Sequence, residues 1–209
     1  MKFSRTAISI LAASFFVLAL PTIQHATLAA QQPASADDLQ SKAPAVVFII
    51  RHAEKPMDDK DPNLAPQGYK RANALPALFL PTPGSSNLPR FPRPNVLFAS
   101  DPSKHSNRPI ETITPLAAAL HQTIHHEYTD LEFSALANQV LSGKYAGKVV
   151  LICWHHGEIP HLAKALGATE TPKHWDDTVF DQVWMLECVN GKAQFSILPE
   201  RLLPGDAVR

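Results

Sequence analysis

Continuous apolar runs alternate with amphipathic segments along most of the chain. Residues 45–50 and 148–154 are runs rich in Val and Ile, which are typical of strands buried on both faces, as in a parallel sheet. Shorter strands are predicted at residues 95–99 and 123–128. Helices are predicted at residues 66–80, where Pro76 should cause a kink or break, and at residues 109–120, 131–141 and 159–166.

A hairpin signal stands near the C-terminus. Residues 180–187 and 192–198 are strand-like segments on either side of Asn190-Gly191, a dipeptide that favours two-residue β-hairpin turns. Strands that alternate with helices and end in a hairpin predict an α/β fold. We therefore expect one domain over residues 45–209, a three-layer α/β/α sandwich with a mostly parallel central sheet and a C-terminal β-hairpin.

The first thirty residues have the three parts of a secretory signal peptide. Lys2 and Arg5 precede an apolar run over residues 7–20, and small residues follow up to Ala29-Ala30. The run is shorter than the roughly 20 residues that a membrane-spanning helix needs.

This pattern predicts that the mature protein works outside the cytoplasm. We expect residues 1–30 to be a signal peptide cleaved near Ala29 or Ala30, and residues 31–44 to be a flexible leader. The mature protein would be periplasmic or secreted, without a membrane span after cleavage. An uncleaved anchor is the alternative, because the cleavage site lacks a clean Ala-x-Ala.

Composition narrows the class of protein further. The chain has 209 residues, of which 45% are hydrophobic, and this is enough for a globular core. Its 19 basic and 19 acidic residues give a formal net charge of zero, which argues against a nucleic-acid partner. Two cysteines are too few for a disulfide scaffold or a thiolate zinc site. Cys153 and Cys188 fall in predicted strands, so we expect buried free thiols.

Arginine and histidine follow three separate predicted strands. Arg51 and His52 come directly after the first strand, Arg108 opens the helix after the second, and His155 and His156 follow the strand at 148–154. Ligands bind at the carboxyl ends of strands in open α/β sheets. Because packing does not require these side chains at strand ends, their convergence predicts an anion-binding pocket that contains a reactive histidine.

Four sequence elements occur in an order that is known from one family. They are Arg51-His52-Ala53-Glu54-Lys55, Leu64-Ala65-Pro66-Gln67-Gly68 with Arg71-Ala72, the segment Ser100 to Thr112, and Val149 to Gly157. They resemble, in that order, an opening Arg-His-Gly or Arg-His-Ala, a Leu-Thr-x-x-Gly-x-x-Gln-Ala helix start, a Ser-x-x-x-Arg-Ala-x-x-Thr element, and an apolar strand followed by His. The loop before Arg108 is longer than in the family pattern. Over residues 45 to 200 the sequence resembles the histidine phosphatases of the phosphoglycerate mutase-like superfamily.

The resemblance implies a reaction and a role for each pocket residue. His52 would be the nucleophile that forms a phosphohistidine, which water then hydrolyses. Arg51, Arg108 and a second histidine would bind the phosphoryl group, without a metal or any other cofactor. The substrate would be a phosphorylated small molecule or a phosphoprotein.

Two parts of this assignment stay open. The second histidine is His156 if the His-Gly dipeptide marks it, and His155 if the His-x-x-x-Ile spacing does; we prefer His156. The possible general acids are Asp130, Glu132 and Glu158. Some relatives that act on good leaving groups have no evident acid, and this chain could resemble them.

Residues on the loops expected to cover the pocket could add selectivity. Lys55 and His105 lie on these loops and are candidates for binding further anionic groups of the substrate.

Two other function classes compete with a phosphatase. A His-rich metal site is suggested by His121, His125 and His126, although a strand over residues 123–128 would separate them. A non-catalytic binder of phosphorylated ligands would keep the arginine pocket without turnover. Mutase activity within the same superfamily is disfavoured by export, since mutases serve cytosolic pathways.

Overall fold

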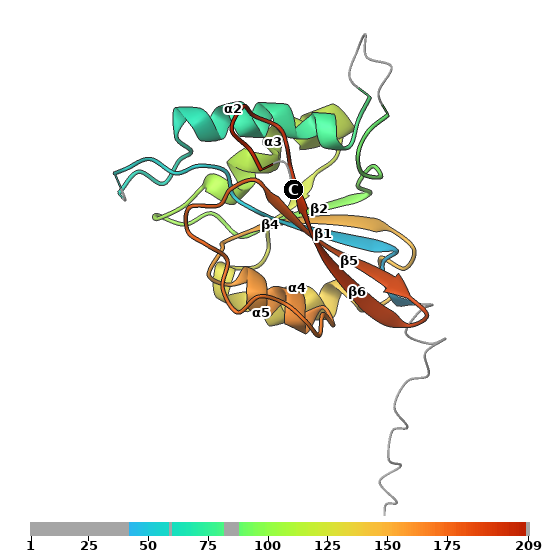
Figure 1. Cartoon of the computed structure of the whole chain (residues 1–209). Coiled ribbons are helices and arrows are strands. Elements are labelled where there is room, and N and C mark those ends of the chain that lie inside the picture. The colour runs from blue at the N-terminus through green and yellow to red at the C-terminus, as the bar shows by residue number, and fades with distance from the viewer. Residues whose placement is uncertain (1–41, 59, 82–87, 208–209) are drawn as a thin grey trace, which may run out of the picture. The chain divides into compact units, whose positions relative to one another are not determined.

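The apolar runs of the sequence form a six-stranded sheet. The computed structural model describes residues 42–207 apart from 59 and 82–87 (Figure 1). The strands are β1 (Val46–Arg51), β2 (Val96–Ala99), β3 (Ile124–His125), β4 (Val149–Trp154), β5 (Gln182–Val189) and β6 (Lys192–Pro199). Their order is β3-β2-β4-β1-β5-β6, with β1 to β4 parallel and β5 antiparallel to both β1 and β6. The predicted mostly parallel sheet is confirmed.

The register of β4 brings distant parts of the sequence to one edge. β4 pairs with β1 on one side and with β2 on the other, so that Arg51 faces Trp154 and Ala99 faces Cys153. β1, β2 and β4 therefore end at the same edge of the sheet, and the residues that follow these strands begin side by side.

Helices cover both faces of the sheet, as predicted for a three-layer sandwich. The helices are α2 (Pro66–Ala74), α3 (Arg108–Leu120), α4 (Phe133–Val140) and α5 (Ile159–Ala165), with short 3₁₀ turns η1 (Leu75–Leu78) and η2 (Asp130–Glu132). α2 and α3 lie on one face, and α4 and α5 on the other (Figure 1). Proline occupies the first turn of α2, α3 and α5, where its missing N–H leaves no helical hydrogen bond unmade.

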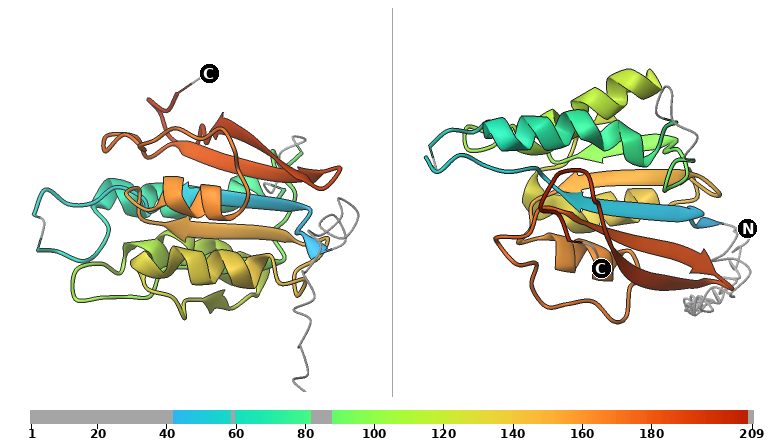
Figure 2. Two further views of the ribbon diagram at one scale, coloured as in Figure 1. Left: turned by 90° about the horizontal axis from the view of Figure 1, so that it is seen from below. Right: turned by 45° about the horizontal axis from the view of Figure 1, so that its top comes forward.

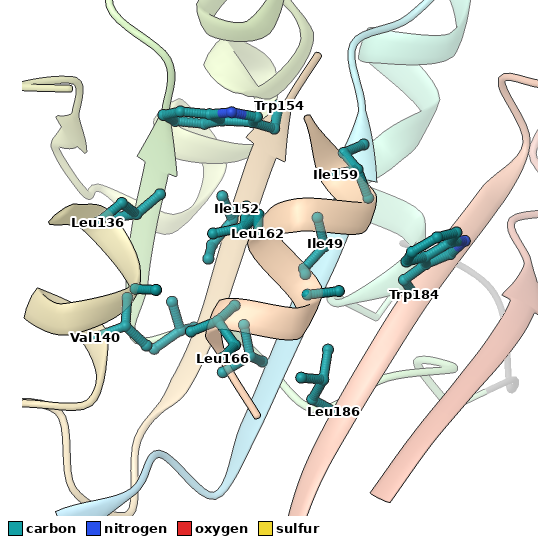
Figure 3. Close-up of a cluster of buried hydrophobic side chains, with 14 of the residues drawn as sticks. Ile49, Leu136, Val140, Ile152, Trp154, Ile159, Leu162, Leu166, Trp184 and Leu186 are labelled. Atoms are coloured by element: carbon teal, nitrogen blue, oxygen red, sulfur yellow. The ribbon is translucent and has the colours of Figure 1, made fainter. Parts of the chain in front are cut away.

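Alternate strand residues supply two separate cores. Ile49 and Ile152 point toward α4 and α5, where they pack with Leu162 and Trp184 (Figure 3). Phe48, Ile50 and Leu151, which lie on the opposite side of the sheet, point toward α2 and α3. Because both faces are covered, the central strands are apolar throughout, which is why they were recognisable as uninterrupted runs.

Two predicted elements are shorter than the sequence suggested. The helix expected over residues 66–80 changes to a 3₁₀ turn after Ala74, at the predicted break around Pro76. The strand expected over 123–128 is reduced to Ile124–His125. Beyond it, Nδ1 of His125 lies 3.1 Å from the Glu127 carboxylate and Nδ1 of His126 lies 3.1 Å from the Asp101 carboxylate.

The C-terminal hairpin is confirmed. Asn190 and Gly191 form a two-residue turn with φ of 52° and 73°, and Val189 pairs with Lys192. Positive φ at both positions is the geometry that Asn-Gly favours in a hairpin. The hairpin extends the sheet beyond β1 (Figure 2). Cys153 is a buried free thiol as expected, whereas Cys188 is only partly buried.

The predicted signal peptide lies outside the described residues. The same holds for residues 31–41 of the predicted leader. All described residues belong to one compact unit, Ala34–Arg209. None of the helices in the described part of the chain has the length and hydrophobicity needed to cross a membrane.

Candidate active site

The ends of β1 and β4 place two histidines against each other. The His52 amide donates to the carbonyl oxygen of Trp154 at 3.0 Å, which continues the strand pairing one residue further. The imidazole rings of His52 and His155 then lie edge to face, with centroids 5.3 Å apart and planes at 65°. His52 is buried, with 3% of its surface exposed.

One contact determines which nitrogen of His52 can react. Nδ1 lies 2.8 Å from the carbonyl oxygen of Ala53. A carbonyl can only accept, so Nδ1 carries the proton and Nε2 has the free lone pair. Burial lowers the pKa of His52 well below 6.5, and the charges of Arg51 and Arg108 lower it further, against the opposing effect of the Ala53 hydrogen bond. The lowered pKa favours the neutral imidazole, in which the lone pair of Nε2 is free.

Arg51 is held in place by hydrogen bonds to the loop that precedes β5. Its Nη1 donates to the carbonyl oxygens of Asp176, Asp177 and Val179 at 3.3, 2.7 and 3.1 Å, and its Cζ lies 3.9 Å from the centroid of the Phe180 ring. The buried Nε finds no hydrogen-bond partner among the described residues. Burial lowers the pKa of Arg51 to about 10, so the guanidinium stays charged at neutral pH. A fixed, charged group with an unused donor can bind an oxyanion.

Arg108 is the first residue of α3, the helix that follows β2. Nη1 donates to the carbonyl oxygen of Asp61 at 2.9 Å and Nη2 to that of His105 at 3.2 Å. Its positive charge is one of the causes that lower the pKa values of His52, His155 and Arg51. Its charge therefore acts on all three of these groups.

The two candidate second histidines occupy different positions. His155 faces His52, and burial lowers its pKa to about 4, with nearby Asp130 acting against the shift. Nε2 of His156 instead lies 2.8 Å from the Asp177 carboxylate, and 32% of the side chain is exposed. Geometry thus favours His155, the alternative to the preference for His156 that the sequence suggested, as the histidine that lies beside His52.

The three possible general acids differ in their contacts and in their exposure to solvent. Asp130 interacts electrostatically with His155, and its carbonyl oxygen accepts from Nε1 of Trp154 at 3.0 Å. Exposed Glu132 accepts from the amide and hydroxyl of Thr129 at 2.9 and 2.8 Å, and these bonds lower its pKa. Glu158 is the N-cap residue of α5 and is partly buried. Of the three, Asp130 is the carboxylate whose charge acts on His155.

The proposed selectivity residues lie at the exposed side of the site. Lys55 is exposed, and its charge contributes to lowering the pKa of His156. His105 is exposed as well, and its backbone oxygen, not its ring, contacts Arg108.

Thr112 links the pocket elements from within the protein. Its Oγ1 accepts from the Ala53 amide at 2.9 Å and donates to the carbonyl oxygen of Arg108 at 2.7 Å. The residue that orients His52 is thereby connected to the helix turn that carries Arg108. Thr112 is part of the family-like segment in the sequence, so a signal for it existed, whereas nothing in the sequence marked the loop at 176–180.

The histidines of the alternative metal hypothesis are dispersed. His121 ends α3 with a φ of 54°, while His125 lies in β3. Within the part of the chain that the structure describes, no three side chains of His, Cys, Asp or Glu gather as metal ligands.

Solved structures share this arrangement of elements. A phosphoglycerate mutase from Bacillus anthracis superposes with a TM-score of 0.53 and 10% identity, covering 76% of this chain and 95% of that one. The chain has the phosphoglycerate mutase-like fold. A candidate alpha-ribazole-5′-P phosphatase from Escherichia coli has the same fold, with a TM-score of 0.50 and 14% identity over 77% of this chain and 98% of that one.

The phosphoglycerate mutase-like fold is thus shared at low sequence identity. A candidate phosphohistidine phosphatase SixA from Agrobacterium tumefaciens aligns with 16% identity and a TM-score of 0.48, covering 74% of this chain and 98% of that one. No family model matches the sequence, and no curated protein matches it. The two structures with TM-scores of 0.53 and 0.50 confirm the resemblance recognised in the sequence at the level of the fold.

Proposed function

We propose that this protein is a phosphatase that acts through a phosphohistidine on His52. The observation that carries the proposal is the orientation of His52, whose Nδ1 proton is committed to the Ala53 carbonyl in a pocket shared with His155 and two arginines. A neutral imidazole with a defined free nitrogen beside fixed cations suits attack on a phosphorylated substrate.

In the first step Nε2 of His52 attacks phosphorus. The N–P bond forms as the bond from phosphorus to the leaving oxygen or nitrogen breaks, and the leaving group takes the bonding electron pair. Arg51 and Arg108 bind the phosphoryl oxygens, whose charge is redistributed in the transition state. His155 donates a further hydrogen bond, because a bound phosphate dianion favours the protonated imidazole and raises its pKa.

The leaving group needs a proton unless it is stable as an anion. Of the three acids considered, Asp130 has the best support, since it interacts with His155, while Glu132 is bonded to Thr129. In the second step water attacks the phosphohistidine, the N–P bond breaks, and its electron pair returns to Nε2. Inorganic phosphate leaves, and the proton lost by water replaces the one given to the leaving group.

The substrate is proposed by class only. A phosphomonoester, a phosphohistidine or a phosphoanhydride on a small molecule or a protein would fit the pocket chemistry. Exposed Lys55 and His105 are proposed to contact further anionic groups of that substrate. The two guanidinium groups supply the positive charge that Mg²⁺ supplies in other phosphoryl-transfer enzymes, so the proposed reaction uses no metal or other cofactor.

We also propose that the enzyme is exported. This rests on the positive start, apolar run and small-residue end of residues 1–30. Cell fractionation of the full chain tests it: recovery of a shortened form in the periplasm or medium would support export, and recovery of the full-length form in the cytosol would contradict it.

The test of function is phosphate release from p-nitrophenyl phosphate by the full chain with EDTA present. We expect turnover that survives EDTA and falls by roughly a thousandfold or more in His52→Ala. His174→Ala, which changes an exposed histidine outside the pocket, is the matched control and should retain wild-type activity. Full activity in His52→Ala would refute the nucleophile. Phosphate binding without any turnover would instead favour the non-catalytic binder.

A further inference from the structure

The buried guanidinium of Arg71 bonds three acidic side chains. Arg71 lies on α2 with 5% of its surface exposed. Its Nε and Nη2 donate to Glu54 at 3.1 and 2.9 Å. Nη1 donates to Glu200 and Asp206 at 3.0 and 2.9 Å, and Nη2 also donates to Asp206 at 2.9 Å. These bonds use all five N–H groups of the guanidinium.

The three carboxylates come from parts of the chain that are far apart. Glu54 is two residues after His52, Glu200 directly follows β6, and Asp206 lies in the C-terminal segment. Asp206 also accepts from the backbone amides of Leu202 and Leu203 at 2.8 and 2.9 Å, which folds that segment back on itself. The cluster of Glu54, Arg71, Glu200 and Asp206, called here the Arg71 cluster, joins the C-terminus to the loop after β1.

That loop has little freedom next to His52. The carbonyl oxygen of Glu54 accepts from the Ala65 amide at 2.8 Å, and a Cβ on Gly68 would lie only 2.4 Å from the same oxygen. The preceding residue, Ala53, is the one whose carbonyl orients the His52 ring. A shift of Glu54 therefore moves the acceptor that fixes the free nitrogen of His52.

The positive charge of Arg71 makes its link between Glu54 and Asp206 specific to arginine. In the family motif that the sequence resembles, the position of Arg71 is a glutamine, and a neutral amide has neither the charge nor the five N–H donors that bond Glu54, Glu200 and Asp206 here. With arginine in place, the bidentate bonds to Glu54 and Asp206 define the position of both chain segments.

We infer that the Arg71 cluster positions His52, so that the C-terminal segment from Glu200 to Asp206 supports the active site. Arg71 and Asp206 act as positioning residues: they hold Glu54, Glu54 holds Ala53, and Ala53 orients the imidazole. The role rests on the proposed function of His52 as nucleophile, but the positioning itself can be measured without turnover.

The first experiment compares Asp206→Asn and Arg71→Gln with wild type. On p-nitrophenyl phosphate we expect kcat to fall by roughly tenfold, because small displacements of a reacting group cost rate. KM and the Kd of inorganic phosphate should stay within about twofold, because Arg51 and Arg108 are untouched. Asp206→Glu, which retains the charge, should recover most of kcat, and Glu170→Gln, an exposed carboxylate outside the cluster, is the control.

The second experiment uses nitrogen NMR of the His52 ring. Wild type should show Nδ1 protonated and Nε2 unprotonated, and Asp206→Asn should shift these signals while Glu170→Gln leaves them unchanged. Wild-type signals and kcat in both cluster variants would overturn the inference, as would a loss of phosphate affinity equal to the loss of kcat. If wild type had no turnover at all, the proposed function would fail, and the NMR shift alone would decide the positioning role.

Discussion

The imidazole rings of His52 and His155 meet edge to face 5.3 Å apart, although more than a hundred residues separate them in the sequence. Parallel pairing of β1 with β4 causes this contact, because Arg51 and Trp154 are partners and the next residues leave the sheet together. His156, one position further, turns toward Asp177 instead. His155 and His156 are adjacent in the sequence, but they contact different parts of the protein.

The first prediction distinguishes these two histidines. His155→Ala should lower kcat/KM for p-nitrophenyl phosphate by roughly a hundredfold, because the proposed mechanism has this ring bind the transferred phosphoryl group. His156→Ala should cost less than about tenfold, since it contacts the loop that holds Arg51. Steady-state kinetics of both variants measure the difference. A larger loss in His156→Ala would restore the choice made from the His-Gly dipeptide.

The second prediction concerns protonation of the pocket. Burial lowers the pKa of His52 well below 6.5 and that of His155 to about 4. Both rings should therefore be neutral in the ligand-free protein at neutral pH and take up protons only in acid. NMR titration of the ring protons, assigned with His52→Asn and His155→Asn, tests this. A midpoint near 6.5 for either ring would contradict the burial argument.

The third prediction concerns stability and the Arg71 cluster. Burial raises the pKa of Glu200 to about 8, with Asp206 and Asp181 adding to the shift and Arg71 opposing it. Between 4.5 and about 8 the unfolded chain has lost this proton while the folded protein keeps it, so stability falls as pH rises through that window.

Glu200→Gln removes the titrating group and should remove this loss. Urea unfolding at about pH 5 and pH 8 should show the wild type losing about 3 kcal/mol more than the variant across that range. An identical pH dependence in both proteins would mean that Glu200 is ionised in the folded state, paired with Arg71.

The fourth prediction tests the packing of α2 on the loop after β1. Gly68→Ala would place a Cβ 2.4 Å from the Glu54 carbonyl oxygen and 3.0 Å from its amide nitrogen. Both are backbone atoms that cannot rotate away, so we expect a loss of about 2 kcal/mol in the free energy of unfolding. Gly157→Ala is the control, because nothing lies within 4 Å of its added Cβ. Equal stability of the two variants would refute the close approach.

Much of the fold could be predicted because its signals are local. The strands are uninterrupted apolar runs, since helices cover both faces, and Asn190-Gly191 encodes its own turn. Because β1 and β4 are parallel neighbours, the residues at their carboxyl ends, Arg51, His52 and His155, lie at one edge of the sheet. The predicted strand over residues 123–128 was too long, since only Leu97 and Phe98 of β2 pair with β3.

The supports of the site could not be predicted in the same way. Arg51 is held by three backbone carbonyls from residues 176–179. Every residue type has a backbone carbonyl, so the sequence of the loop does not indicate this contact. The contact of Arg71 with Asp206 spans 135 positions and depends on how the C-terminal segment folds back. Such contacts follow from the tertiary structure alone.

The most direct test of the central claim is to trap the phosphoenzyme. Wild type mixed with labelled substrate and quenched rapidly should carry an acid-labile, base-stable label on His52, located by peptide mapping, and His52→Ala should carry none. A label on another residue, or turnover that continues in His52→Ala without any labelled intermediate, would contradict the assignment of His52 as the nucleophile.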